Sequence, residues 1–426
     1  MAHGWSTWNR RPRARPGSGG TGGPGRRPGP LTLAVLCLLG LALGCAGGSL
    51  QVPRQHWTLM LYVAADNNLA PVVGSVLANL KASEADQGVT VVAQVGLPGV
   101  TRKRYWIRPQ GLWTLEDLGD LNMASGGALQ DFVAYGAATF PAEHYALVLW
   151  GHGDGWKGIL NDVDHGVQDP LSHVTVAAAI QAAGVSLAIL GADACNIGTL
   201  EAAYQYRNAA AILVGSQEYV QGNGWDYQDL LARMEADPDM APEALAGQMV
   251  ASYQAYVESP AYGFQDQTMA AMRLGPPMAG LGQAVGALAD ALGQQEADPQ
   301  AEPAALAALT RARNQAQPVY QAFSPGTYVD LKDFCDQLPA SAQAAQVTAA
   351  LASDLIADYH GTSLPRASGL SIVFYDPPQA LAFGVYDLNY APYDPAAGTG
   401  SQLDFLNQFS WPEMMYTYIK AANPPG

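Results

Sequence analysis

The sequence is poor in cysteine, in charged residues and in long apolar runs. Four cysteines among 426 residues are too few for the disulfide framework of a small secreted domain. Only 14% of the residues are charged and 49% are hydrophobic, so the chain is not a disordered tail and can bury a sizeable core. Beyond residue 50 no stretch approaches the about 18 apolar residues that predict a membrane-spanning helix. The length suits one large or two moderate domains.

Basic residues are scarce and unevenly placed. Residues 1–50 hold six of the 21 Lys and Arg residues and none of the 37 Asp and Glu residues, so the remainder carries a net charge of −22. A nucleic-acid-binding protein needs a basic face to neutralise phosphates. We therefore expect no nucleic-acid partner. An acidic body instead suits the attraction of cationic substrates.

The N-terminal segment is typical of an export signal. Residues 31–43 form an apolar run behind the basic stretch, which is too short to span a bilayer comfortably. The sequence before Cys45 resembles a bacterial lipobox, although Ala42 stands where leucine is usual. We predict a leader over 1–44 and a linker over 45–56, with Cys45 as the lipidated N-terminus of an exported, membrane-anchored protein. Ordinary secretion, periplasmic or extracellular, and an uncleaved anchor are the alternatives.

From residue 57 apolar runs alternate with helical patterns. The runs are apolar throughout, which is typical of parallel strands buried on both faces. The predicted strands are Trp57–Ala65, Val89–Val95, Tyr145–Trp150, Leu187–Leu190 and Ala211–Gly215. The predicted helices are 69–82, 127–138, 174–183 and 198–208. This alternation predicts an α/β fold with a mostly parallel central sheet. A hairpin at a sheet edge is predicted over 102–115.

The pattern changes beyond about residue 228. Alanine- and glutamine-rich helical patterns predominate there, and we interpret Gln294–Ala305 as a surface linker. Apolar runs return at Thr268–Leu274, Tyr328–Leu331 and Leu370–Tyr375, and these either extend the sheet or build a second subdomain. The expected organisation is a core over 57–230 and a helix-rich region over 231–426.

A histidine and a cysteine follow two of the predicted strands. His152 comes after Trp150 among several glycines, and Cys195 follows the next predicted strand. Ligands of open α/β sheets bind beyond the carboxyl ends of the strands, so the two side chains can meet there as base and nucleophile. A cysteine in that place is also explained as a small buried hydrophobe, and the glycines as a tight turn.

Two local features would support this chemistry. The amides of Gly153 and Cys195 are suited to hold an oxyanion. A helix beginning near Gly198 would favour the thiolate through its N-terminal dipole. The other candidates have plainer interpretations: His165 and His173 as polar loop residues, and 66–68 as a turn that could also line the cleft.

The blocks around His152 and Cys195 resemble the clostripain-like cysteine peptidases of the caspase-like clan. The resemblance covers most of residues 57–375 through MLYVAADNNL, LVLWGHGDGW, ILGADACNIGTLE, VGSQEYVQGNGWDY and GLSIVFY. It implies a caspase-like α/β/α sandwich. It also implies a cysteine endopeptidase in which His152 is the general base and Cys195 forms a thioacyl-enzyme.

The same resemblance implies cleavage of polypeptides after Arg or Lys. A cationic side chain needs an acidic pocket, and Asp193 matches the family's aspartate two residues before the cysteine. Asp226 is a second candidate, although an exposed aspartate is often a solvated loop charge or a helix cap. The resemblance leaves calcium open as a cofactor, with Asp162 and Asp164 as potential ligands, but two carboxylates fall short of a metal site.

Related enzymes are often matured by self-cleavage after Lys or Arg between the histidine and the cysteine. Lys157 is the only basic residue in that interval, so we predict a chain that stays whole or is trimmed elsewhere. Two other functions remain open from the sequence. One is a catalytically silent, surface-tethered scaffold or binding lipoprotein with the same fold, and the other is a hydrolase of non-peptide amides.

Overall fold

The computed structural model describes residues 52–81, 88–109, 111–166, 170–298, 300–377 and 390–422. The predicted leader and Cys45 lie outside these ranges. Leu50–Gly426 forms one compact unit, so the boundary expected near residue 230 does not divide it. Within the described ranges, no helix has both the length and the apolar character needed to cross a bilayer.

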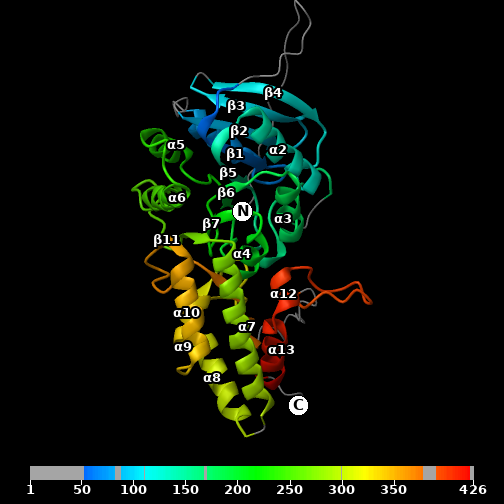
Figure 1. Cartoon of the computed structure of the whole chain (residues 1–426), viewed down its shortest axis with the longest axis vertical. Coiled ribbons are helices and arrows are strands. Elements are labelled where there is room, and N and C mark those ends of the chain that lie inside the picture. Colours follow the sequence, from blue (N-terminus) through cyan, green and yellow to red (C-terminus); the bar gives the residue numbers. More distant parts are fainter. Residues whose placement is uncertain are drawn as a thin grey trace, which may run out of the picture. The chain divides into compact units, whose positions relative to one another are not determined.

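A nine-stranded sheet forms the centre of this unit (Figure 1), in the order β11-β8-β7-β6-β5-β1-β2-β3-β4. The five strands from β7 to β2 run parallel to one another, and the outer strands pair antiparallel. The strands are β1 (Gln55–Ala64), β2 (Val89–Gly96), β3 (Arg102–Arg108), β4 (Gly111–Gly119), β5 (Ala142–Trp150), β6 (Leu187–Asp193), β7 (Ala210–Gly215), β8 (Thr268–Arg273) and β11 (Leu355–His360). The predicted α/β fold and edge hairpin are confirmed, and two strands from beyond residue 230 extend the sheet.

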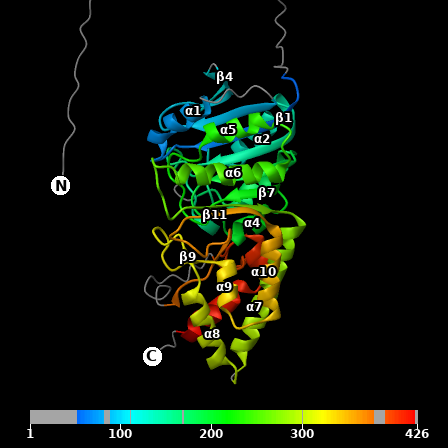
Figure 2. The same cartoon turned by 90° about the vertical axis from the view of Figure 1, so that its left-hand side faces the viewer.

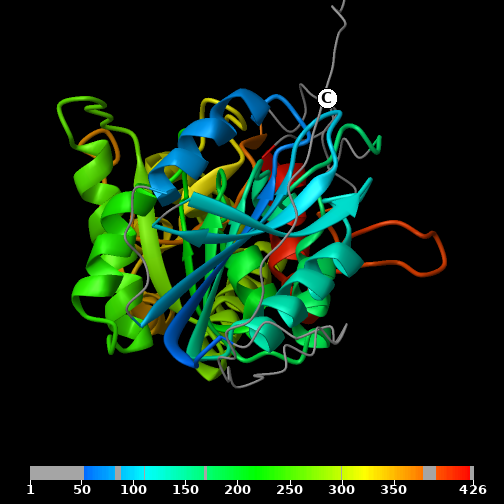
Figure 3. The same ribbon diagram turned by 90° about the horizontal axis from the view of Figure 1, so that it is seen from above.

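Helices cover both faces of the sheet, as Figure 3 shows from above. One apolar core lies under α2 (Gly126–Thr139), α3 (His173–Ala182) and α4 (Leu200–Tyr206). A second core lies under α1 (Val73–Lys81), α5 (Tyr227–Ala236) and α6 (Pro242–Val257) on the other face. Strands that are apolar on both faces can be buried only in such a three-layered arrangement.

The C-terminal half adds a helical layer beyond the β11 edge (Figures 1 and 2). A small antiparallel sheet, β12-β10-β9, lies within it. Its strands are β9 (Pro318–Val319), β10 (Tyr328–Asp330) and β12 (Ser371–Val373), and its helices are α7 (Pro276–Ala297), α8 (Glu302–Gln315), α9 (Leu331–Gln337), α10 (Ala342–Asp354), α12 (Asp404–Gln408) and α13 (Trp411–Ala422). Leu281 and Trp411 belong to the same apolar cluster as Leu147 of β5, so this layer shares the core of the main sheet.

The prediction of a linker at Gln294–Ala305 is wrong. Helix α7 continues to Ala297 and α8 begins at Glu302. Alanine and glutamine are good helix formers, and Glu296 within the segment is buried against the core. A composition that is typical of linkers therefore belongs here to two packed helix ends.

Candidate active site

The loops that carry His152 and Cys195 leave the sheet at one edge. Strands β5 and β6 are parallel neighbours, and their ends, Trp150 and Asp193, are paired in register. His152 and Cys195 both line one cavity of about 470 Å³, which we call the cleft. A separate cavity of about 520 Å³ near Lys157 contains neither residue. The cleft is therefore the candidate active site.

Gly153 allows the histidine loop to lie against the cysteine turn. A Cβ atom at Gly153 would lie 2.1 Å from the backbone oxygen of Cys195 and 3.0 Å from its nitrogen. Any side chain there would separate the two loops. No hydrogen bond from the backbone amide of either Gly153 or Cys195 to another backbone group is found in the described ranges. Both amides thus remain available to hold an oxyanion.

The turn after Cys195 presents the sulfur to the cleft. Asn196 has φ 53°, a left-handed conformation that is uncommon for a residue with a side chain. Its amide donates to the carbonyl oxygen of Glu218 at 2.8 Å, which ties the turn to the segment after β7. The Cys195 sulfur lies 3.8 Å from the carbonyl oxygen of Val220. This fixed turn sets the direction of the thiol.

Burial holds both members of the pair in their neutral forms. It raises the pKa of the Cys195 thiol, and the nearby charges of Asp193 and Glu218 act in the same direction. Burial also lowers the pKa of His152. Helix α4 begins at Leu200, close to the start near Gly198 that the sequence predicts. Neither side chain is therefore held in its charged form.

Asn68 holds the imidazole from the side of β1. Its Oδ1 lies 2.6 Å from Nε2 of His152. An amide oxygen can only accept a hydrogen bond, so Nε2 carries the proton and Nδ1 keeps a lone pair. The sequence predicts a turn over 66–68 that could also line the cleft. Within this turn, Asn68 is the residue that contacts the histidine.

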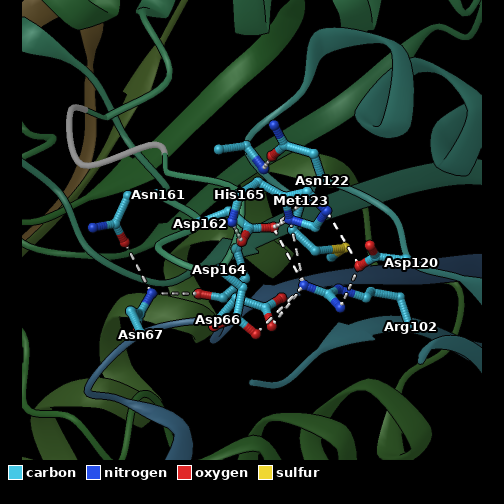
Figure 4. Close-up of polar contacts among 12 residues, drawn as sticks. Asp66, Asn67, Arg102, Asp120, Asn122, Met123, Asn161, Asp162, Asp164 and His165 are labelled. Carbon is cyan, nitrogen blue, oxygen red and sulfur yellow. Dashed lines mark hydrogen bonds and ion pairs between the residues drawn. The ribbon is translucent and has the colours of Figure 1, made fainter. Parts of the chain in front are cut away.

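A buried charge network anchors the loop that bears Asn68 (Figure 4). Arg102 lies 3.0 Å from the Asp66 carboxylate and 3.8 Å from that of Asp162, and all three side chains are buried. Burial raises the pKa of Asp66 to about 6. Next to it, Asn67 donates to Oδ1 of Asn161 at 2.9 Å. The loop carrying Asn68 is thus fixed to the core through its neighbours.

The same network accounts for the two carboxylates considered for calcium. Asp162 accepts from the amide of Met123 at 2.8 Å and pairs with His165 at 3.0 Å. Asp164 accepts from the amide of Gly99 at 2.9 Å. In the part of the chain that the structure describes, no group of three or more His, Cys, Asp or Glu residues is arranged to hold a metal ion. The residues present therefore do not fit a calcium site.

Asp193 is buried and is among the residues that line the cleft. Its Oδ2 accepts hydrogen bonds from the amide of Trp225 at 2.9 Å and the hydroxyl of Tyr227 at 2.6 Å. Its Oδ1 has no hydrogen-bond partner among the described residues. Burial raises the pKa of this carboxyl to about 7. One oxygen of this buried carboxylate is therefore without a donor from the described residues.

Asp226 has a different role in the structure. Its Oδ1 accepts from the amide of Asp229 at 3.1 Å, which caps α5, and it is not among the residues that line the cleft. The helix-cap interpretation therefore describes it, and we do not include it in the pocket. The segment GNGWDY still contributes, because Trp225 and Tyr227 hold Asp193.

The interpretation of His173 as a polar loop residue is wrong. It begins α3 and is fully buried. Its Nε2 lies 2.7 Å from the carbonyl oxygen of Gly155, and its Nδ1 lies 2.5 Å from the hydroxyl of Tyr206. Burial lowers its pKa to about 4. This neutral imidazole ties the loop after His152 to α4.

Sequence reasoning missed the residues that the C-terminal half brings to the cleft. Tyr320 and Phe323 follow β9 and line the cavity. The hydroxyl of Tyr320 interacts with the Cys195 thiol and tends to lower its pKa. The backbone amide of Tyr320 donates to the carboxylate of Glu218. No local pattern marks these residues, because the contacts join segments that are remote in sequence.

The sequence matches the model of the clostripain family over residues 61–374. This chain belongs to the clostripain family. Clostripain from Hathewaya histolytica is 27% identical to it over 134 residues, which are 28% of this chain and 26% of clostripain. The match thus spans about a quarter of that curated relative.

Two solved structures share the fold of this family member. A secreted C11 cysteine protease from Bacteroides thetaiotaomicron, in complex with an irreversible peptide inhibitor, matches with a TM-score of 0.60 and 16% identity, covering 75% of this chain and 92% of the other. An inactive zymogen C11 protease from Parabacteroides distasonis matches with a TM-score of 0.59 and 19% identity, covering 78% of this chain and 97% of the other. The expected caspase-like α/β/α architecture is confirmed.

Proposed function

We propose that this clostripain-family protein is a cysteine endopeptidase that cleaves after Arg and, less efficiently, after Lys. One observation carries the proposal: a single cleft is lined by His152, Cys195 and a buried Asp193 that has an oxygen without a partner. Family membership supports peptide hydrolysis, and the acidic end of the cleft supports a basic residue before the scissile bond.

The proposed mechanism begins from the neutral pair. As the Cys195 sulfur attacks the substrate carbonyl carbon, Nδ1 of His152 takes the thiol proton. The amides of Gly153 and Cys195 donate to the oxyanion. His152 then protonates the amine as the C–N bond breaks, which leaves a thioester on Cys195. A water molecule, deprotonated by His152, hydrolyses this thioester and restores the thiol.

Asp193 would supply the specificity. A guanidinium can donate to the free Oδ1 while Oδ2 keeps its bonds to Trp225 and Tyr227. An arginine side chain presents a planar set of donors and is more weakly hydrated than an ammonium group, so it suits a buried carboxylate better than lysine does. Reporter peptides that differ only in Arg, Lys or uncharged citrulline test this. We expect the order Arg, then Lys, then citrulline, and equal turnover of Arg and citrulline peptides would contradict the proposal.

Replacing Asn68 with alanine should lower kcat about 10-fold and leave KM almost unchanged, since a positioning group typically contributes one to two orders of magnitude. Without the Asn68 acceptor, the imidazole ring of His152 can rotate, and its proton is no longer held on Nε2. Asn68→Asp keeps the acceptor and adds a negative charge, so it should retain the geometry and move the acidic limb of the pH–kcat profile to higher pH. Steady-state kinetics from pH 5 to pH 9 checks both variants. A kcat that is unchanged in Asn68→Ala would remove Asn68 from the mechanism.

We further propose export with lipid attachment at Cys45. The short apolar run and the residues before Cys45 support this, and one related structure is that of a protease described as secreted. Metabolic labelling with an alkyne fatty acid should mark the wild-type protein and not Cys45→Ser. Labelling of both proteins, or of neither, would contradict lipidation at this cysteine.

A further inference from the structure

Three aromatic side chains line one side of the cleft. Phe323 is 62% exposed, the largest exposure among the large hydrophobic residues of the described chain. Its ring stacks on that of Tyr320 with centroids 5.3 Å apart, and the ring of Tyr219 lies 5.8 Å from it. All three residues line the same cavity as Cys195. We call Tyr219, Tyr320 and Phe323 the aromatic wall.

The aromatic wall is held in place before any ligand arrives. The Tyr219 hydroxyl donates to Oδ2 of Asp266 at 2.7 Å. The Tyr320 amide donates to Glu218, and the Phe323 amide donates to the carbonyl oxygen of Tyr320 at 3.3 Å. A surface that is already ordered loses little conformational entropy on binding. A large apolar ring that is both fixed and exposed is typical of a binding surface.

The sheet order shows which part of a substrate reaches this wall. Strand β6 lies between β5 and β7, so the Cys195 turn lies between His152, which follows β5, and Tyr219, which follows β7. His152 has to protonate the leaving amine, which places the leaving group on the β5 side. The acyl portion therefore extends toward β7.

We infer that the aromatic wall is a subsite for an apolar, preferably aromatic, side chain on the residue immediately before the basic residue. The inference rests on the proposed function, because the basic side chain at Asp193 sets the register of the substrate. The basic side chain then lies at Asp193, and the carbonyl carbon of the same substrate residue lies at the Cys195 sulfur. The substrate residue before it therefore lies on the β7 side, beside Tyr320 and Phe323. The chemical class of substrate is thus a peptide with an apolar residue followed by Arg.

The test uses reporter peptides X-Arg in which X is Phe, Leu, Gly or Asp. For the wild-type protein we expect kcat/KM to be about 10-fold higher for Phe than for Gly, the scale of small changes in an apolar pocket. Phe323→Ala should lower kcat/KM for the Phe peptide about 10-fold, mostly through KM, and leave the Gly peptide almost unchanged. Because Phe323 is largely exposed, its removal costs little packing.

Trp113→Ala is the matched control. Trp113 is 51% exposed on β4 and is not among the residues that line the cleft. Its removal should therefore leave kcat/KM unchanged for all of the X-Arg peptides. If Phe323→Ala lowered kcat/KM equally for the Phe and Gly peptides, or if the wild-type protein cleaved all X-Arg peptides with the same kcat/KM, the aromatic subsite would be contradicted. The proposed cleavage after Arg would then still stand. Failure of the wild-type protein to cleave any X-Arg peptide would overturn the subsite together with the proposed function.

Discussion

Cys195→Ala is expected to lower kcat for an Arg reporter peptide by about 10⁵-fold, the scale seen when a covalent nucleophile is removed. No other cysteine of the described chain lines the cleft, so no thiol can replace it. Alanine removes only the sulfur and leaves the amide of residue 195 in place to donate to an oxyanion. Binding should persist, and KM should change little. Steady-state kinetics with the purified proteins measures both constants.

Cys335→Ala is the control for this variant. Cys335 lies in α9 and is buried in the core, so its loss should lower the stability by about 1 kcal/mol or more and leave turnover of the folded protein unchanged. An arginine chloromethyl ketone should label the wild-type protein and Cys335→Ala but not Cys195→Ala. Wild-type protein that neither turns over the peptide nor takes the label would be the silent scaffold.

The candidate site could be predicted from the sequence because it lies at strand ends. Continuous apolar runs such as that ending at Trp150 predict buried parallel strands, and parallel strands deliver their following loops to one edge. Once β5 and β6 are recognised as neighbours, the nearness of His152 and Cys195 follows. The position of Asp193 near the same edge can be predicted in the same way, because it is the last residue of β6.

The surroundings of the site could not be predicted in the same way. Burial, with the charges of Asp193 and Glu218, raises the pKa of Cys195, and Glu218 comes from a segment that the prediction from strand ends did not include. The Tyr320 contact depends on a segment after β9, whose two residues give no strand signal of their own. Such contacts are products of packing between distant segments, where local periodicity carries no information.

Asp193→Asn should lower kcat/KM for Arg peptides by about 10²- to 10³-fold, the range for truncating one partner of a buried charged pair. The amide oxygen can still accept from the Trp225 amide and the Tyr227 hydroxyl, which preserves the fold. The amide nitrogen then replaces the free carboxylate oxygen, so it presents a donor to a guanidinium that also only donates. Turnover of citrulline peptides should change far less.

The pH dependence of the two proteins gives a second measurement of the same residue. The ordinary pKa of an aspartate is 3.8, and burial raises that of Asp193 to about 7, so the empty pocket is protonated below this value and ionised above it. KM for Arg peptides in the wild-type protein should therefore increase as the pH falls from 8 to 6, because a neutral carboxyl attracts a cation weakly. Asp193→Asn should show no such step in KM.

Asp226→Asn separates specificity from the general acidity of the region. Asparagine caps helices about as well as aspartate, so this variant removes one negative charge from the same segment and should keep the bond to the Asp229 amide. We expect kcat/KM for Arg peptides and the KM step between pH 6 and pH 8 to match those of the wild-type protein. If Asp226→Asn lost as much activity as Asp193→Asn, recognition would come from the summed negative field around the cleft, and the free oxygen of Asp193 would not be the specificity determinant.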